Sequence, residues 1–406
     1  MKLKVLYGLP PKVLFCKKTL MSNQRPLSAI EFNHGIKSKK ETIKFNKNGI
    51  SDTWFYSRKK KEINWKNREI ELLKLLDRHR GKHGKYDCIV PGSGGKDSVM
   101  ASHILKFEYG MNPITVTWPP ILYTDYGYKN FQNWLNSGNL DNISAKRDEH
   151  TMKVLTRLSI ENLFHPFQTF MLGQKIFSAK ISSKLNIPLV FYGENEAEHG
   201  NNAKDNKKPT RSQKYFSSND NKNLLLGGIS VNALINDYNL KIKHLEDFLP
   251  LKNNDIKEKK IEQHYLGYYK EWTPQEAFYY AVQKGNFRPR PFRTEGTYSK
   301  YNSIDDKIDD LHYWTVLIKF GYGRATCDVS QELRNDHLTI KEGKELIKKY
   351  DLEFPNRYFD EIMEYVGIKK KDFHKLCNRF RSPHIWKKTS SGWKLRHNCN
   401  YNGTDD

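Results

Sequence analysis

The chain has 406 residues, and 69 Lys and Arg against 46 Asp and Glu give it a formal net charge of +23. This length allows a large core, and although 37% hydrophobic and 28% charged residues make the chain polar, 13% aromatic residues argue against disorder. Apolar runs fall short of the ~18 residues that a membrane span needs, and the N-terminus lacks a signal-peptide pattern, so we expect a cytoplasmic protein without membrane insertion.

We divide the chain into three regions. Residues 1–80 are an N-terminal lobe that ends in a helix, because apolar residues between 61 and 80 follow helical spacing. Residues 81–290 form an α/β domain with a polar insertion over 201–260, which holds one predicted helix near 231–248. Residues 291–406 form a helical region. Capping-box patterns start at Thr273 and Thr339, and further helices are predicted near 304–320, 340–350, 357–366 and 371–380.

Strands and helices alternate in the second region. Apolar runs at 86–90, 112–118 and 188–192 are predicted strands. Helical spacing follows at 99–109, 131–135, 149–163 and 171–185. This alternation predicts a parallel sheet, in which ligands bind at the carboxyl ends of the strands. The loops after Val90, Trp118 and Tyr192 should therefore face one cleft.

The most informative segment is the glycine loop, Ser93-Gly94-Gly95-Lys96-Asp97-Ser98, between the first strand and its helix. Glycines allow positive φ and close approach of a ligand, and a helix N-terminus offers free N–H groups and partial positive charge. The loop lacks the Walker A spacing. We interpret it as an anion cradle suited to pyrophosphate; a glycine-rich turn without ligand is the alternative.

Polar clusters follow elsewhere in the sequence. Residues 193–200, with acids at Glu194, Glu196 and Glu198 beside His199, come directly after a strand and would suit Mg²⁺ or sugar hydroxyls, unless they form a solvated loop. The aspartates of 305–310 suit a helix start, or a metal or ammonia-handling site.

Two single residues and the net charge leave alternatives open. Arg324 could bind phosphate or lie in a helix–helix turn. His165 could orient a substrate, although structural roles are commoner for a lone His. The positive charge suits solvated Lys- and Asn-rich loops such as 201–208 and 252–260, an anionic substrate or an acidic partner, and nucleic acid is a minority interpretation. Five cysteines without a C-x-x-C pair indicate reduced thiols.

Several blocks in order resemble the N-acetyl sugar amidotransferase family of PP-loop ATP pyrophosphatases, which acts in lipopolysaccharide and flagellar glycan pathways, including pseudaminic and legionaminic acid modification. These blocks are SGGKDS at 93–98, LYTDYG at 122–127, GENEAEHG at 193–200, HYLGYY at 264–269, RTEGTYSKY at 293–301, SIDDKIDDLHYW at 303–314 and GYGRAT at 321–326. The resemblance implies an adenine nucleotide alpha hydrolase-like, Rossmann-like α/β fold with a helical C-terminal region.

The resemblance also implies a reaction. ATP adenylates the oxygen of a sugar's acetamido group, and ammonia displaces AMP to leave an acetamidino sugar, as in a C–N ligase. A separate glutaminase and its cyclase-like partner supply the ammonia. Implied catalytic residues are Lys96, Asp97, Glu194 and Glu196, with Asp97 on Mg²⁺. ATP would contact Ser93, Gly94, Gly95, Lys96, Asp97, Ser98 and Asp125. The sugar would contact Glu198, His199, Arg293, Glu295, Tyr298, Lys300 and Arg324.

One departure from the family concerns zinc. The family begins with two C-x-x-C pairs, which align here with Cys16 and Thr19 and with Lys37 and Lys40. A single cysteine cannot hold structural zinc, so we expect none. The rival classes are a tRNA-modifying PP-loop enzyme, favoured by the positive charge, and a catalytically silent scaffold, which the intact glycine loop disfavours.

Overall fold

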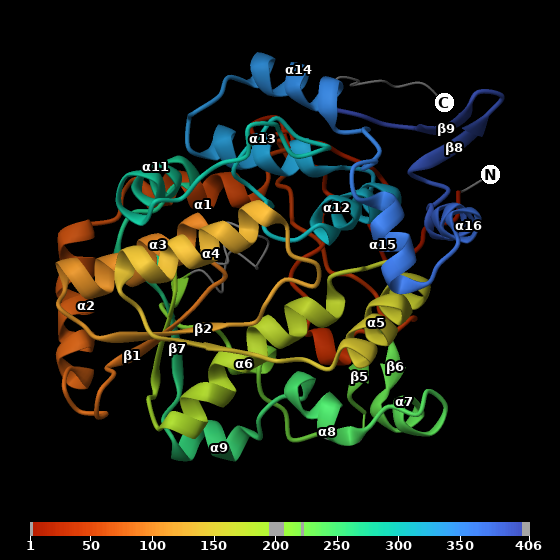
Figure 1. Ribbon diagram of the computed structural model, residues 1–406. Helices are drawn as coiled ribbons and strands as arrows, with labels where there is room; N and C mark the ends of the chain where they lie inside the picture. Colours follow the sequence, from red (N-terminus) through yellow and green to blue (C-terminus); the bar gives the residue numbers. More distant parts are fainter. Residues whose placement is uncertain (1–2, 195–206, 221–222, 400–406) are drawn as a thin grey trace.

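The computed structural model describes residues 3–194, 207–220 and 223–399, and is built around a five-stranded parallel sheet (Figure 1). The strand order is β3-β2-β1-β4-β7. The strands are β1 Cys88–Pro91, β2 Pro113–Thr117, β3 Asn142–Ser144, β4 Leu189–Tyr192 and β7 Glu262–Tyr265. The predicted α/β class with a helical C-terminal region is confirmed.

The central strands alternate their side chains between two layers of helices. Cys88 and Val90 of β1 belong to one apolar cluster, which includes residues of α2 Trp65–His79 and α3 Lys96–His103. Ile89 belongs to a second cluster, which includes residues of α6 Gln168–Leu185. Because successive strand residues point to opposite faces, helices cover the sheet on both sides.

The strand order reverses direction at the centre of the sheet. The chain moves from β1 to β2 and β3 on one side, and then crosses to β4 and β7 on the other side. The loops that follow β1 and β4 therefore diverge and leave a crevice at the carboxyl ends of the strands. This switch point is the usual ligand site of parallel α/β sheets.

Some elements differ from the sequence predictions. Helix α3 begins at Lys96, three residues before the predicted start, and passes into a π-helix over Ile104–Glu108. The predicted single helix at 231–248 is wrong, because it is broken into α7 Val231–Asn236 and α8 Ile242–Leu245. Elements that the sequence did not predict include β3, β7, α1 Asp52–Lys60, α13 Arg324–Arg334 and the hairpin of β8 Trp386–Thr389 with β9 Gly392–Leu395.

The other helices lie around this frame. Helix α11 Pro274–Gly285 packs on α3 and on α4 Asp125–Gly138. The C-terminal region contains α12 Ile308–Phe320, α14 Ile340–Tyr350, α15 Phe359–Val366 and α16 Lys370–Phe380. Smaller elements are α5 Glu149–Leu158, α9 Asn253–Glu258, α10 Leu266–Tyr269 and the short pair β5 Leu225–Leu226 and β6 Ile229–Ser230. No helix within the described ranges is long and apolar enough to cross a membrane.

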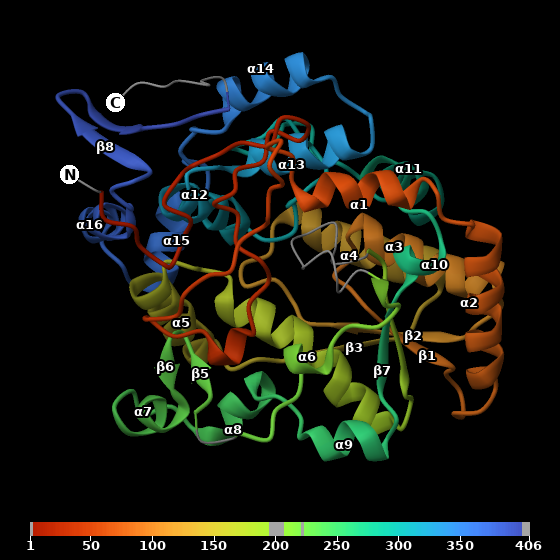
Figure 2. The same cartoon turned by 180° about the vertical axis from the view of Figure 1, so that it is seen from behind.

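The N-terminal segment is tied to the C-terminal region, over which it lies in Figure 2. The Tyr7 hydroxyl donates to Phe380 O at 2.8 Å, and Leu6 N donates to Ser382 Oγ at 3.0 Å. Residues from the first lobe to β8 also share one apolar cluster. The first and last regions of the chain are therefore packed together. The three-region division itself stays a prediction.

A buried carboxylate stabilises the start of α13. Gly323, the residue before this helix, has no capping side chain of its own. Instead Asp351, at the end of α14, accepts from Gly323 N and Thr326 N, each at 2.8 Å, and from Thr326 Oγ1. Asp351 thus takes the place of an N-cap side chain for α13. It accepts hydrogen bonds from N–H groups that have no acceptor within α13 itself.

We expect Asp351→Ala to lower the free energy of unfolding by about 1–3 kcal/mol, because it leaves buried N–H groups unpaired. Chemical denaturation followed by circular dichroism measures this change. Asp360→Ala is the matched control, since Asp360 lies in the first turn of α15 with its side chain 74% exposed. Its cost should stay within about 0.5 kcal/mol. Equal costs for the two variants would contradict the capping role.

Candidate active site

The glycine loop lies at the switch point, between the end of β1 and the start of α3. Gly94 has φ +86°, and a Cβ there would lie 2.5 Å from the Cα of Phe131 on α4. A Cβ on Gly92 would lie 2.2 Å from the Cβ of Ser98. Gly95 has open space around its Cβ position. The first two glycines are therefore needed for packing, whereas Gly95 leaves room for a ligand.

Lys96 and Asp97 occupy the first turn of α3. Lys96 Nζ lies 2.5 Å from Asp97 Oδ2, and Trp272 Nε1 donates to Asp97 Oδ1 at 2.9 Å. The Trp272 backbone carbonyl accepts from Lys60 Nζ of α1. Trp272 was not among the predicted site residues, because it lies far along the chain in a loop without a motif. The structure makes it the group that orients the Asp97 carboxylate.

Gly193 and Glu194 follow β4 on the other side of the crevice. A Cβ on Gly193 would lie 2.4 Å from the backbone oxygen of Asp97, so only glycine allows this approach. Burial and the nearby negative charge of Asp97 raise the pKa of Glu194. Two of the predicted carboxylates are therefore brought together. The other predicted residues of this block, Glu196, Glu198 and His199, lie outside the described residues.

Three of the cavities within the described part of the chain that adjoin the loop are large enough to matter here. The loop cavity, about 150 Å³, is lined by Ser93, Asp97, Trp118, Tyr192 and Glu194 among others, so the loops after β1, β2 and β4 do face one cleft as predicted. The aspartate cavity, about 200 Å³, contains Asp305 and Asp309. The histidine cavity, about 440 Å³, contains His165 and His312. Lys96 lines both the histidine and the aspartate cavity.

Trp118 and Gln174 are further cavity residues that the sequence predictions missed. Trp118 is buried in the loop cavity, and its Nε1 has no hydrogen-bond partner within the described part of the chain. Gln174 of α6 lines both the loop cavity and the histidine cavity. A buried unpaired donor is costly, so Trp118 Nε1 favours a ligand acceptor at this position.

The predicted aspartates at 305–310 hold the C-terminal region against the loop. Ser93 Oγ donates to Asp305 Oδ2 at 2.8 Å. Asp306 accepts from Ile121 N, Leu122 N and Ile308 N, which fixes the segment before α4. These contacts favour the structural interpretation of the cluster. Asp125, a predicted ATP contact, is exposed in the first turn of α4 and lines none of these three cavities.

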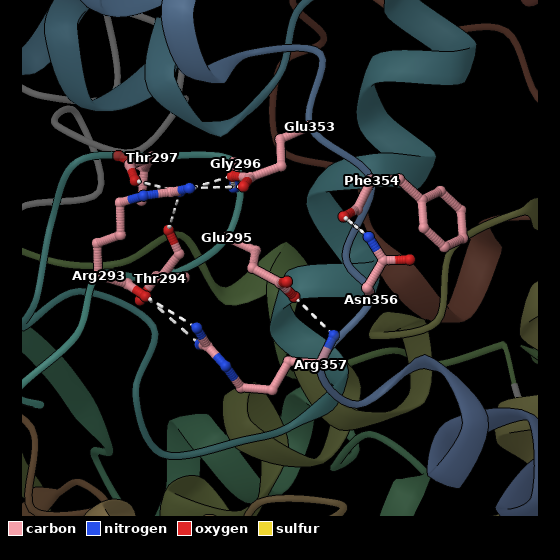
Figure 3. Close-up of polar contacts among 9 residues, drawn as sticks. All are labelled: Arg293, Thr294, Glu295, Gly296, Thr297, Glu353, Phe354, Asn356 and Arg357. Carbon is pink, nitrogen blue, oxygen red and sulfur yellow. Dashed lines mark hydrogen bonds and ion pairs between the residues drawn. The ribbon is translucent and has the colours of Figure 1, made fainter.

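Two predicted sugar contacts, Arg293 and Glu295, bind residues further along the C-terminal region (Figure 3). Both guanidinium NH groups of Arg293 lie 2.5 Å from the Glu353 carboxylate oxygens. Glu295 accepts from Arg357 N at 2.9 Å. Their partners lie about 60 residues away in sequence, which the sequence pattern alone does not reveal. Neither residue lines the loop, aspartate or histidine cavity.

Of the remaining predicted sugar contacts, Arg324 lines a cavity beside the loop, whereas Lys300 and Tyr298 line none of the three cavities. Lys300 is exposed, and burial raises the pKa of Tyr298, whose hydroxyl has no hydrogen-bond partner among the described residues. Arg324 lines the histidine cavity, where its Nε lies 3.0 Å from Asp328 and its guanidinium stacks 4.2 Å from the Tyr313 ring centroid. Arg324 is therefore the predicted sugar contact that the described structure places at a cavity beside the loop.

The N-terminal residues that align with the zinc ligands of the resembled family make other contacts in this structure. Cys16 Sγ accepts a hydrogen bond from Ser51 N at 3.2 Å, and Thr19 is fully buried. Lys40 Nζ lies 3.4 Å from His34 Nδ1. Among the residues that the structure describes, no group of three or more His, Cys, Asp or Glu is arranged to hold a metal ion. The expectation of no zinc stays a prediction.

Comparison with known proteins gives two matches. Residues 295–399, about a quarter of the chain, match the family described as LPS biosynthesis protein WbpG-like, C-terminal domain. Over 53 residues, 13% of this chain, the sequence is 40% identical to a Methanocaldococcus jannaschii protein named uncharacterized protein MJ1599, and this match spans 19% of that protein. The match to a lipopolysaccharide biosynthesis family fits a role in polysaccharide biosynthesis.

The two adjacent loop glycines allow a matched test. Gly94→Ala should lower the melting temperature, since an alanine at φ +86° is strained and its Cβ meets Phe131. Gly95→Ala should leave stability within about 0.5 kcal/mol, because its Cβ meets open space. If that space holds phosphate, however, Gly95→Ala should reduce the rise in melting temperature caused by ATP.

Thermal unfolding with and without ATP measures both effects. A Gly94→Ala variant as stable as the parent would contradict the loop conformation. An undiminished ATP response in Gly95→Ala would contradict the phosphate cradle.

Proposed function

We propose that the protein is an ATP-dependent amidotransferase that converts an acetamido group of a sugar to an acetamidino group. The observation that carries this proposal is the glycine loop at the switch point, with Lys96 lining the histidine cavity and Asp97 lining the loop cavity. The family match of the C-terminal region supports a polysaccharide precursor as substrate.

The reaction proceeds in two steps in this proposal. The acetamido oxygen attacks the α-phosphorus of ATP, the bond to the β-phosphate breaks, and pyrophosphate leaves. Ammonia then attacks the adenylated carbon, the C–O bond to AMP breaks, and loss of a proton leaves the acetamidino group. An amide is a poor electrophile, so attaching AMP to its oxygen supplies the leaving group that the second step needs.

The loop residues have distinct roles in the first step. Backbone N–H groups at the start of α3 and the Lys96 ammonium offset the negative charge of the departing pyrophosphate. Mg²⁺, which neutralises phosphate charge when bound, fits beside Asp97 and Glu194, because two adjacent carboxylates favour a cation and Asp97 already raises the pKa of Glu194. Trp272 keeps the Asp97 carboxylate oriented toward the loop.

We expect Lys96→Ala and Asp97→Asn each to lower the rate of AMP formation by about a hundredfold or more, because each removes an electrostatic group from the reacting phosphates. The assay combines the protein with ATP, ammonium and candidate N-acetylated sugars, and detects AMP, pyrophosphate and amidine by mass spectrometry. Lys388→Ala, on the exposed face of β8, is the control and should keep full activity.

The products separate this function from others. AMP and pyrophosphate must appear in step with the amidine. Release of ADP and phosphate, or full activity in both loop variants, would exclude the proposed reaction. Modification of a tRNA instead of a sugar would favour the rival PP-loop class.

Ammonia is expected to come from a partner protein. We propose a glutaminase subunit together with a cyclase-like subunit that channels ammonia, as the family resemblance implies. The isolated chain should therefore form amidine from ammonium salts but not from glutamine, which product detection in parallel reactions would show. Equal rates with the two nitrogen sources would contradict the need for a partner.

A further inference from the structure

The positive charge of the chain is concentrated in two segments. Residues 1–85 contain 22 Lys and Arg against seven Asp and Glu, and residues 369–396 contain ten against one. The rest of the chain is close to neutral, because the totals are 69 Lys and Arg against 46 Asp and Glu. The shorter segment, which comprises α16 and the β8–β9 hairpin, has the higher charge density.

Seven exposed lysines of this shorter segment form the C-terminal basic surface. The α16 helix and the hairpin lie near each other at one end of the molecule, at the right of Figure 1 and the left of Figure 2. Asp360 of α15 pairs with one of these lysines at 2.6 Å, and Asp372 pairs with another at 2.9 Å. The other five form no ion pair within the described ranges. The seven residues are Lys369, Lys370, Lys371, Lys375, Lys387, Lys388 and Lys394.

Two lysines of the hairpin occupy unfavourable positions. Lys387 of β8 lies directly opposite Lys394 of β9 in the antiparallel register, and both are exposed. Like charges in this arrangement destabilise a pair of strands. Neither lysine has a carboxylate partner in the described part of the chain. The hairpin therefore carries positive charge that its own folding does not need.

The start of α16 also carries unfavourable charge. Lys369, Lys370 and Lys371 occupy its N-cap and first two positions, where the helix dipole disfavours cations and no side chain caps the helix. Asp372 offsets part of this charge, since a hydrogen bond from Lys375 and the charges of the neighbouring lysines lower its pKa. Residues that break a local rule in two adjacent elements are expected at functional sites.

The arginines of the same segment are engaged within the protein. Arg379 and Arg396 donate to backbone carbonyls. The Arg381 guanidinium lies 5.1 Å from the ring centroids of both Trp386 and Trp393. The unengaged cations of the C-terminal basic surface are therefore ammonium groups.

This kind of cation indicates the class of partner. An ammonium is a point charge without the fork geometry by which arginine binds individual phosphates. Nucleic acids are bound by such forks and by aromatic rings that stack on bases, whereas the Trp393 ring here contacts Arg381. Protein interfaces are depleted in lysine. A lysine-rich surface suits an extended acidic surface that requires no precise alignment, such as a layer of acidic lipid headgroups.

We propose that the C-terminal basic surface binds acidic lipid headgroups, so that the protein associates with a membrane surface without crossing it. The N-terminal segment, which is hydrogen-bonded to residues 380 and 382, adds an apolar contact through Leu3, whose side chain is 46% exposed. This inference goes beyond the proposed reaction and does not rest on it.

The test is co-sedimentation of the full chain with lipid vesicles. One set of vesicles contains phosphatidylcholine alone, and the other contains about one third phosphatidylglycerol, which supplies the acidic headgroups. The protein should bind the acidic vesicles at least about tenfold more tightly than the neutral ones. Binding should weaken as the salt concentration rises, because ions screen exposed charges.

Variants locate the surface. Lys394→Glu should weaken binding to acidic vesicles by about 25-fold, since each lysine contributes about fivefold and this change reverses one charge. Lys252→Glu is the matched control, because it makes the same charge change at an exposed residue beside α9, at the opposite end of both ribbon views. Its effect should stay below about twofold. Melting temperatures check folding, and that of Lys394→Glu should not fall, because the new carboxylate faces Lys387.

Equal binding to both kinds of vesicle, no binding to acidic vesicles, or equal losses in the two variants would overturn the inference. Tighter binding to RNA at the same phosphate concentration, abolished by Lys394→Glu, would also overturn it and assign the surface to nucleic acid. The assay contains neither ATP nor sugar, so failure of the proposed reaction would leave these results unchanged.

Discussion

The close approach of β4 to the start of α3 is the contact on which the site depends. Gly193 lies so near the Asp97 backbone that any side chain would collide with it. On the other side, Gly94 lies equally close to Phe131 of α4. The loop is therefore held between the end of β4 and α4 by backbone contacts. A rearrangement of side chains cannot make room for a larger residue at either glycine. This constraint keeps the N-terminal N–H groups of α3 directed into the crevice, and leaves Gly95 as the open position.

Polar side chains of the loop are held by hydrogen bonds with residues from distant parts of the chain. Lys96 pairs with Asp97, which is in turn held by Trp272, and the Trp272 carbonyl accepts from Lys60. Ser93 is held by Asp305. The N-terminal lobe, the segment before α11 and the segment before α12 thus each contribute one polar contact to the loop or to its partners. The positions of the side chains in the six-residue glycine loop therefore depend on these contacts with distant parts of the chain.

The sequence predicted the features that are encoded locally. Strands β1, β2 and β4 are buried apolar runs, and the glycine loop follows the first of them, so the sheet and its active edge could be predicted. Strand β7 was missed because its residues Glu262, Gln263 and His264 are polar, and α13 was missed because its cap, Asp351, lies 28 residues away from Gly323. The family resemblance implies a sugar contact for Arg293 and Glu295, and their contacts with Glu353 and Arg357 could not be predicted from the local pattern.

The histidine cavity has walls from segments far apart in the sequence, with Lys40 on one side and His312 and Lys319 on the other. Contacts between segments this far apart in the sequence form slowly during folding, because a long loop must close before they are made. Strands β1, β2 and β4, by contrast, lie within about a hundred consecutive residues. On a ribosome, the sheet with its glycine loop can assemble while α12 is still unmade. The order of synthesis therefore makes the sheet and its glycine loop before the α12 wall of the histidine cavity.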